Sequence, residues 1–301
     1  MKLLATDPRW WDRIFNFEDY GQLLGLVQNS LLAAAVLGVV GGVLGVFVMQ
    51  RDMAFAVHGV AELSFAGAAG ALLVGVSVVT GSLIGSLAAA LAIGLLGAKA
   101  RDRNSAIGVL MPFGLGLGIL FLALYPGRAS SKFGLLTGQI ISVDGPQLGT
   151  LITISVIALT ILLVIWRPLL FDSLDPDVAA ARGVRSNAMS VLFMLALGLV
   201  VAVAIQIVGA LLVLALLVTP AASALRVSAS PVLVPLLSAA FGVLAAVGGI
   251  LLALGGALPI SPYITTISFL TYLACRAIGY TRDRTQQRGA MVGATTLRSQ
   301  T

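Results

Sequence analysis

The sequence predicts an all-α membrane protein, a polytopic bundle of about eight or nine transmembrane helices. Of its 301 residues, 59% are hydrophobic and 10% are charged, and the mean hydropathy is +1.05. Soluble domains usually carry about a quarter charged residues. Most of the chain falls into apolar runs that can cross a hydrocarbon layer about 30 Å thick, so no room is left for a separate catalytic domain.

Nine apolar runs are the expected spans. In chain order they cover residues 22–48, 53–76, 78–98, 105–125, 147–166, 187–208, 209–225, 232–254 and 263–280. No polar loop separates the sixth run from the seventh, and only Gln206 and Gly209 indicate a break between them. In an eight-span alternative, one of the two is a half-helix or a re-entrant segment, which a membrane tolerates only where protein or water covers the backbone.

Two short terminal segments flank the transmembrane domain of residues 22–280. Residues 1–21 hold Trp10 and Trp11 among acidic side chains and lack the apolar core of a cleavable signal peptide, so they are expected to lie at the membrane interface. Residues 281–301 are expected to form a disordered cytoplasmic tail.

The basic residues predict the orientation, because loops rich in Lys and Arg stay in the cytoplasm. With nine spans, thirteen of the 18 basic residues fall on one side: Arg51, Lys99, Arg101, Arg103, Arg167, Arg182, Arg185, Arg226, Arg276, Arg282, Arg284, Arg288 and Arg298. The other five are Lys2, Arg9, Arg13, Arg128 and Lys132, which places the N-terminus outside and the C-terminus in the cytoplasm. Topology and anionic headgroups then account for the net charge of +6, and no nucleic-acid partner is expected.

Small side chains predict close helix packing. The 34 glycines include sets at small-residue spacing, namely Gly38, Gly41 and Gly45, Gly67 and Gly70, and Gly81 and Gly85. Such residues let helix backbones approach where lipid offers no hydrophobic drive for association, and they are consistent with a compact bundle and a tight dimer. Cys275 is the only cysteine, which excludes a disulfide or a thiolate-cluster metal site within one chain. No permanently bound cofactor is expected.

His58 and Glu62 are the candidate metal ligands. They stand four residues apart in the apolar run 53–76, so both side chains project from one face of a helix. Ionisable groups at membrane depth are costly unless paired, hydrated or ligating, and they usually mark an ion pathway. The pair follows the boundary residue Arg51 by seven and eleven positions, about 10 and 16 Å of helix. The alternative is a purely structural ion pair.

The loop between residues 167 and 187 predicts a short helix on the cytoplasmic side. Asp175 or Asp177 can cap a helix that continues to Arg182, and Gly183 can end it. A helix that lies along the membrane face suits the docking of a soluble partner. An ordinary solvated loop is the alternative.

Four stretches of the chain carry a family resemblance. They are SLDPDVAAARG at 173–183, IVGALLVLALLVTPAASA at 207–224, SAIGVLMPFGLGLGILFLAL at 105–124 and FGLLTGQIISVD at 133–144. The first resembles the coupling-loop signature of the metal-importing family of ABC transporter permeases, the zinc and manganese permeases, and the other three are similar to further patterns of that family.

The resemblance implies a transport subunit in the cytoplasmic membrane of a bacterium. Its cargo would be a divalent transition metal ion such as manganese, zinc or iron. Its partners would be an ABC ATPase, an extracytoplasmic metal-binding protein and a second permease copy. The coupling residues would be Asp175, Asp177, Ala180 and Gly183. The chain has no G-x-x-x-x-G-K-[ST] phosphate loop, so we expect no ATPase activity of its own.

The resemblance also bears on the candidate pathway. Members of the family usually carry an aspartate in the second span and a histidine four residues later; here His58 stands at the aspartate position and Glu62 at the histidine position. The pair still offers a nitrogen and up to two oxygens to a divalent ion. Gln206 and Gln139 are weaker candidates for lining the pathway. A stand-alone transporter in which His58 and Glu62 relay protons is the competing interpretation.

Overall fold

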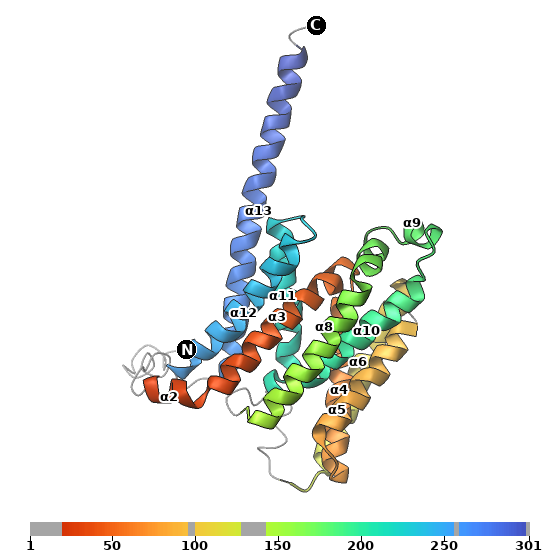
Figure 1. The fold of residues 1–301 in the computed structure, drawn as a ribbon, viewed down its shortest axis with the longest axis vertical. Helices are drawn as coiled ribbons and strands as arrows, with labels where there is room; N and C mark the ends of the chain where they lie inside the picture. The colour runs from red at the N-terminus through yellow and green to blue at the C-terminus, as the bar shows by residue number, and fades with distance from the viewer. Residues whose placement is uncertain (1–19, 96–99, 128–142, 256–258, 299–301) are drawn as a thin grey trace, which may run out of the picture.

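The computed structural model describes residues 20–95, 100–127, 143–255 and 259–298. These residues form eleven α-helices, with no strand among them. In chain order the helices are α2 (Tyr20–Leu26), α3 (Gln28–Gln50), α4 (Ala54–Val74), α5 (Val78–Leu95), α6 (Ala100–Leu124), α8 (Gly145–Leu174), α9 (Pro176–Ala181), α10 (Ser186–Val208), α11 (Ala210–Val227), α12 (Leu233–Leu254) and α13 (Ile260–Arg298). The predicted all-α bundle is confirmed (Figure 1).

Seven of the helices are long and apolar enough to cross a membrane: α3, α4, α5, α6, α8, α10 and α12. They correspond to seven of the nine expected spans. The remaining two expected spans are helical as well, in α11, which carries an apolar helix over Leu212–Val227, and in the first half of α13. The chain is therefore a multi-span helical membrane protein.

The helix boundaries differ from the expected ones in two places and agree with the expected break in a third. The first run is divided, because a turn at Val27 separates α2 from α3. Gly209 separates α10 from α11 at φ +80° and ψ 158°, a conformation open essentially to glycine alone, so the expected break is confirmed. At the other end, α13 continues to Arg298 through the segment in which we expected a disordered tail. That segment is rich in good helix formers and free of proline.

The helices pack around α3, α4, α10 and α11 (Figure 1). On one side α3 packs against α11 and α12, and α13 lies against these two. On the other side α4 packs against α5 and α6, and α10 packs against α5 and α8. Figure 1 shows α9 and the C-terminal end of α13 at one end of the bundle and α2 at the opposite end. The expected cytoplasmic elements thus share one end.

Glycines form the α3–α12 contact. A Cβ added to Gly38 would lie 2.6 Å from the backbone nitrogen of Val243, closer than real Cβ atoms approach. Gly42 is equally tight against Ser238, whose hydroxyl donates a 2.7 Å hydrogen bond to the Gly42 carbonyl. The small residues therefore set the distance between these two helices, as predicted.

Glycines also form the α4–α5 contact. A Cβ on Gly67 would overlap the carbonyl oxygen of Gly81, and a Cβ on Gly85 would overlap that of Leu63. This close approach fixes α4, which carries the candidate metal ligands, against α5.

Candidate metal site and its surroundings

The candidate ligands lie in the first half of α4. His58 is the fifth and Glu62 the ninth residue of this 21-residue helix, which begins three residues after Arg51. The His58 Nε2 atom lies 3.4 Å from Glu62 Oε1, so the two side chains meet as the i, i+4 spacing predicts. The Glu62 side chain is 4% exposed and that of His58 is 27% exposed.

Each member of the pair keeps an unused polar atom. His58 Nδ1 and Glu62 Oε2 are buried without a hydrogen-bond partner among the described residues. Buried polar atoms without a partner are expensive, and they call for a water, an ion or a functional role. No group of three or more His, Cys, Asp or Glu residues gathers within the described part of the chain, so the pair offers at most two metal-binding side chains per copy.

Helix α6 covers one flank of the pair, while another part of α4 stays open. A Cβ on Gly114 of α6 would lie 3.0 Å from the backbone of Glu62, so the two helices nearly touch there. One turn before His58, however, the Phe55 side chain is 69% exposed. The chain alone leaves this part of the α4 surface uncovered.

Hydrogen bonds from serine hydroxyls connect the middle of α4 to two neighbouring helices. The Ser64 and Ser82 hydroxyls lie 2.8 Å apart, and Ser82 donates a 2.8 Å hydrogen bond to the Ala202 carbonyl of α10. The Ser64 hydroxyl also lies 3.0 Å from the Ser82 carbonyl, to which it can donate instead. These bonds are buried and join α4, α5 and α10 within one turn of Glu62.

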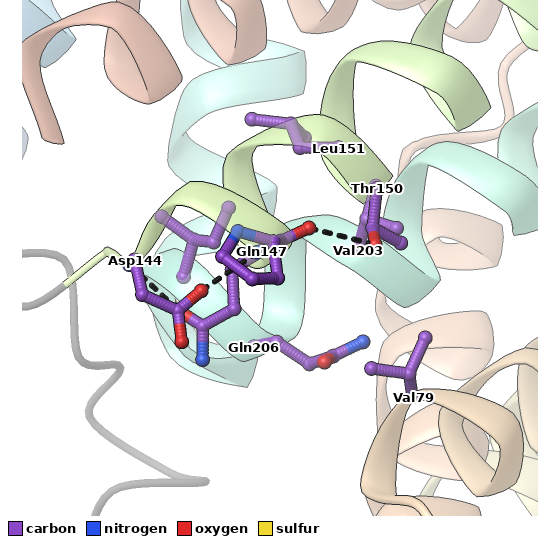
Figure 2. A pocket seen from close by; sticks show the side chains of 9 residues that line it. Val79, Asp144, Gln147, Thr150, Leu151, Val203 and Gln206 are labelled. Atoms are coloured by element: carbon purple, nitrogen blue, oxygen red, sulfur yellow. Dashed lines mark hydrogen bonds between the residues drawn. The ribbon is translucent and has the colours of Figure 1, made fainter. Parts of the chain in front are cut away.

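Gln206 lines a separate cavity of about 160 Å³ between α5, α8 and α10, at the end opposite to α9. Figure 2 shows its side chain between the first turn of α8 and Val79. The Nε2 atom donates a 3.1 Å hydrogen bond to the Ala202 carbonyl, so Gln206 serves the backbone and also faces a cavity. Neither His58 nor Glu62 lines this cavity. Gln139 lies outside the described residues.

Asp144 begins α8 beside that cavity (Figure 2). Its Oδ1 atom accepts a 2.7 Å hydrogen bond from the Gln147 backbone, and the Gln147 side chain accepts one of 3.4 Å from the Asp144 backbone. This reciprocal capping fixes the start of the helix.

The predicted short helix is α9. Asp175 caps it by accepting a 3.0 Å hydrogen bond from the Val178 backbone, and Asp177 lies in its first turn. Gly183 ends it at φ +85°, with its own amide bonded to the Ala180 carbonyl. Asp177, Ala180 and Gly183 are exposed, so this end of the bundle offers an accessible helix.

One buried ion pair was missed by the sequence interpretation. Arg51 Nη1 lies 2.7 Å from Asp172 Oδ2, and the two side chains are 10% and 2% exposed. From the sequence, Arg51 indicates only the orientation of the chain and the boundary of the second span. An acidic residue in the largely apolar last turns of α8 was the available signal, but no local pattern identifies its partner 121 residues away.

The apolar helices define a multi-span membrane protein, and an ionisable pair inside one of them is typical of a transport protein. The sequence pattern of the ABC 3 transport family matches residues 24–279. The chain therefore belongs to this family, which confirms the resemblance to the metal-importing ABC permeases.

Two relatives and one solved structure illustrate the similarity. The manganese transport system membrane protein MntC of Halalkalibacterium halodurans is 34% identical over 75% of this chain and 78% of its own length. The manganese import system permease protein ScaB of Streptococcus parasanguinis is 30% identical over 77% of this chain and 82% of its own. The solved PsaBC from Streptococcus pneumoniae, in complex with Fab, matches with a TM-score of 0.77 at 27% identity, over 86% of this chain and 95% of the solved chain.

Proposed function

We propose that this chain is the membrane-spanning subunit of a bacterial ABC importer and that it conducts Mn²⁺ past His58 and Glu62. The observation that carries the proposal is the pair itself: an imidazole and a carboxylate meet within a membrane span, and each keeps a polar atom without a partner. The relatives named for manganese transport support the choice of ion.

The chemistry of the pair suits a transported ion better than a resident one. Carboxylate oxygens suit Mn²⁺, and imidazole suits the later transition metals, so zinc and ferrous iron are the competing cargoes. Two side chains per copy give few ligands. Conduction requires binding that is strong enough to admit an ion and weak enough to release it, which a full cage of four protein ligands would prevent.

A second copy of the chain would complete the pathway. His58 is partly exposed and Phe55, one turn away, is largely exposed, so in a single copy this face of α4 would meet acyl chains. Pairing two copies across this face would shield it from lipid and bring up to four ligands around a common route.

Energy would come from a separate ATPase bound to α9. This helix is capped at both ends and exposes Val178, while Leu174 before it is 70% exposed. Two neighbouring apolar side chains on a surface that faces water favour contact with another protein. An extracytoplasmic metal-binding protein would deliver the ion at the opposite end of the bundle.

Uptake of Mn²⁺ into proteoliposomes tests the proposal. We expect uptake that requires the permease, the ATPase and ATP together, and a loss of uptake in His58→Ala with ATPase assembly unchanged. Uptake driven by a proton gradient in the absence of the ATPase would instead establish the proton-coupled transporter. Normal uptake by a His58→Ala/Glu62→Ala double variant would exclude the proposed pathway.

A further inference from the structure

We infer that the Arg51–Asp172 ion pair transmits the movement of α9 to α4, so that these two residues are positioning residues of the transport cycle. The inference rests on the proposed function, because it assigns the route by which an ATPase at α9 would act on the metal-binding helix.

The acidic partner lies directly beside α9. Asp172 is in the last turn of α8, three residues before Asp175, which caps α9. Its Oδ2 atom accepts the 2.7 Å bond from Arg51 Nη1, and the same nitrogen lies 3.3 Å from the hydroxyl of Ser173. A displacement of α9 therefore reaches Arg51 through two neighbouring side chains.

The basic partner lies directly before α4, and the turn between them is rigid. Asp52 adopts the left-handed conformation at φ +52°, and the Met53 amide donates a 2.8 Å hydrogen bond back to the Val48 carbonyl of α3. Met53 is buried and α4 begins at the next residue. Because this turn is short and hydrogen-bonded, a displacement of Arg51 moves the first turns of α4, in which His58 lies.

Aromatic packing beneath the ion pair stiffens the same route. Phe47, one turn before Arg51 on α3, meets Trp166 of α8 edge to face with ring centroids 4.8 Å apart. Its ring also lies 6.3 Å from that of Phe193 on α10. Interiors packed in this way pass on displacement because they compress little.

A purely structural role makes a different prediction from transmission. Replacing a buried ion pair by apolar residues of similar size is often neutral for stability. Packed apolar side chains keep the helices together, however, without the directional hydrogen bond that holds Arg51 at a fixed distance from Asp172. A purely structural ion pair can therefore be replaced by packed apolar side chains. An ion pair that transmits movement between α8 and α4 in both directions cannot.

The test measures Mn²⁺ moved per ATP hydrolysed by the full transporter in proteoliposomes. For Arg51→Met/Asp172→Leu we expect ATP hydrolysis to persist while this ratio falls at least about fivefold, within the range of measured couplings between sites. The charge-reversed pair Arg51→Asp/Asp172→Arg should recover the ratio. Arg167→Met, which removes an exposed arginine from α8, is the matched control and should leave the ratio unchanged.

A wild-type ratio in the apolar pair would overturn the inference, and so would a charge-reversed pair that stays uncoupled. Should the apolar pair fail to assemble, Arg51→Lys and Asp172→Glu decide the question, because they keep both charges and change the reach of the link. A lower ratio at unchanged melting temperature supports transmission, and an unchanged ratio refutes it. The wild-type complex distinguishes failure of the inference from failure of the proposed function. Without ATP-driven Mn²⁺ uptake by the wild type, both fail. With wild-type uptake and an unchanged ratio in the variants, only the inference fails.

Discussion

Arg51 and Asp172 join two helices at the α9 end of the bundle, whereas His58 and Glu62 lie on one helix inside it. The first pair is separated by 2.7 Å and the second by 3.4 Å. Asp172 and Glu62 are both buried and each keeps one unpartnered oxygen, but only Asp172 accepts a short bond from a permanently charged partner. The contrast supports a structural and positioning role for the first pair and the proposed metal-ligating role for the second.

The difference has a physical origin in the spacing of the two pairs. An i, i+4 pair cannot hold two helices together, and its imidazole is charged only when protonated. A buried carboxylate in such a setting gains little stability from its neighbour. It gains more from a divalent ion, because ligation also satisfies the orphaned atoms.

The most severe test of this contrast is Glu62→Gln. Losing a group outside the ligand set already costs metal sites about 10- to 100-fold, so losing a carboxylate ligand should lower Mn²⁺ uptake by at least about 100-fold. Uptake of radioactive Mn²⁺ by proteoliposomes measures the change. Asp52→Asn is the matched control, because it makes the same chemical change at an exposed residue whose left-handed backbone asparagine also tolerates. Uptake near the wild-type level in Glu62→Gln would contradict the proposed role of Glu62 as a metal ligand.

Stability should depend more on Asp172 than on Glu62, the reverse of the order expected for Mn²⁺ uptake. Asp172→Asn removes the carboxylate that pairs with Arg51, and breaking a buried pair in this way costs about 3 to 5 kcal/mol. Glu62→Gln removes a carboxylate with one unpartnered oxygen, so it should keep or raise stability. Apparent melting temperatures in one detergent at one scan rate compare the two variants. A larger drop in melting temperature for Glu62→Gln than for Asp172→Asn would give the structural role to His58 and Glu62, contrary to this prediction.

Exchanging the two ligands sharpens the comparison further. The double variant His58→Asp/Glu62→His adopts the acid-then-imidazole order that is usual in the family and keeps the same kinds of ligand atom on one helix face. We expect Mn²⁺ uptake within about tenfold of wild type, equal to about 1.4 kcal/mol in binding. Competition by Zn²⁺ measures any change of preference. Complete loss of uptake would mean that each residue has a position-specific role.

The smallest expected effect concerns the neutral bonds beside Glu62. Ser82→Ala removes the donor to the Ala202 carbonyl and the acceptor for Ser64. Hydrogen bonds between membrane helices average about 0.6 kcal/mol, so the melting temperature should fall only slightly. Thr160→Val removes a bond within one turn on an exposed face of α8 and should leave it unchanged. A drop as large as that of Asp172→Asn would show that serines, and not charges, hold α4 in place.

Patterns within short stretches predicted much of this molecule. Apolar runs located the helices, Gly209 marked the break between α10 and α11, and Asp175 and Gly183 delimited α9. The meeting of His58 with Glu62 followed from helical spacing alone. The division of the first run at Val27 escaped this reasoning, because hydropathy reports how apolar a segment is and not where its axis turns.

The sequence by itself determined that the chain crosses a membrane as helices and carries an acid and an imidazole on one of them. Only the tertiary structure decided that Arg51 meets Asp172, that Gly67 lies against Gly81, and that Ser82 bonds to α10. The physical reason is the range of the forces involved. Helical periodicity and the burial of backbone polar groups act over a few residues, whereas the pairing of distant side chains depends on how whole helices pack.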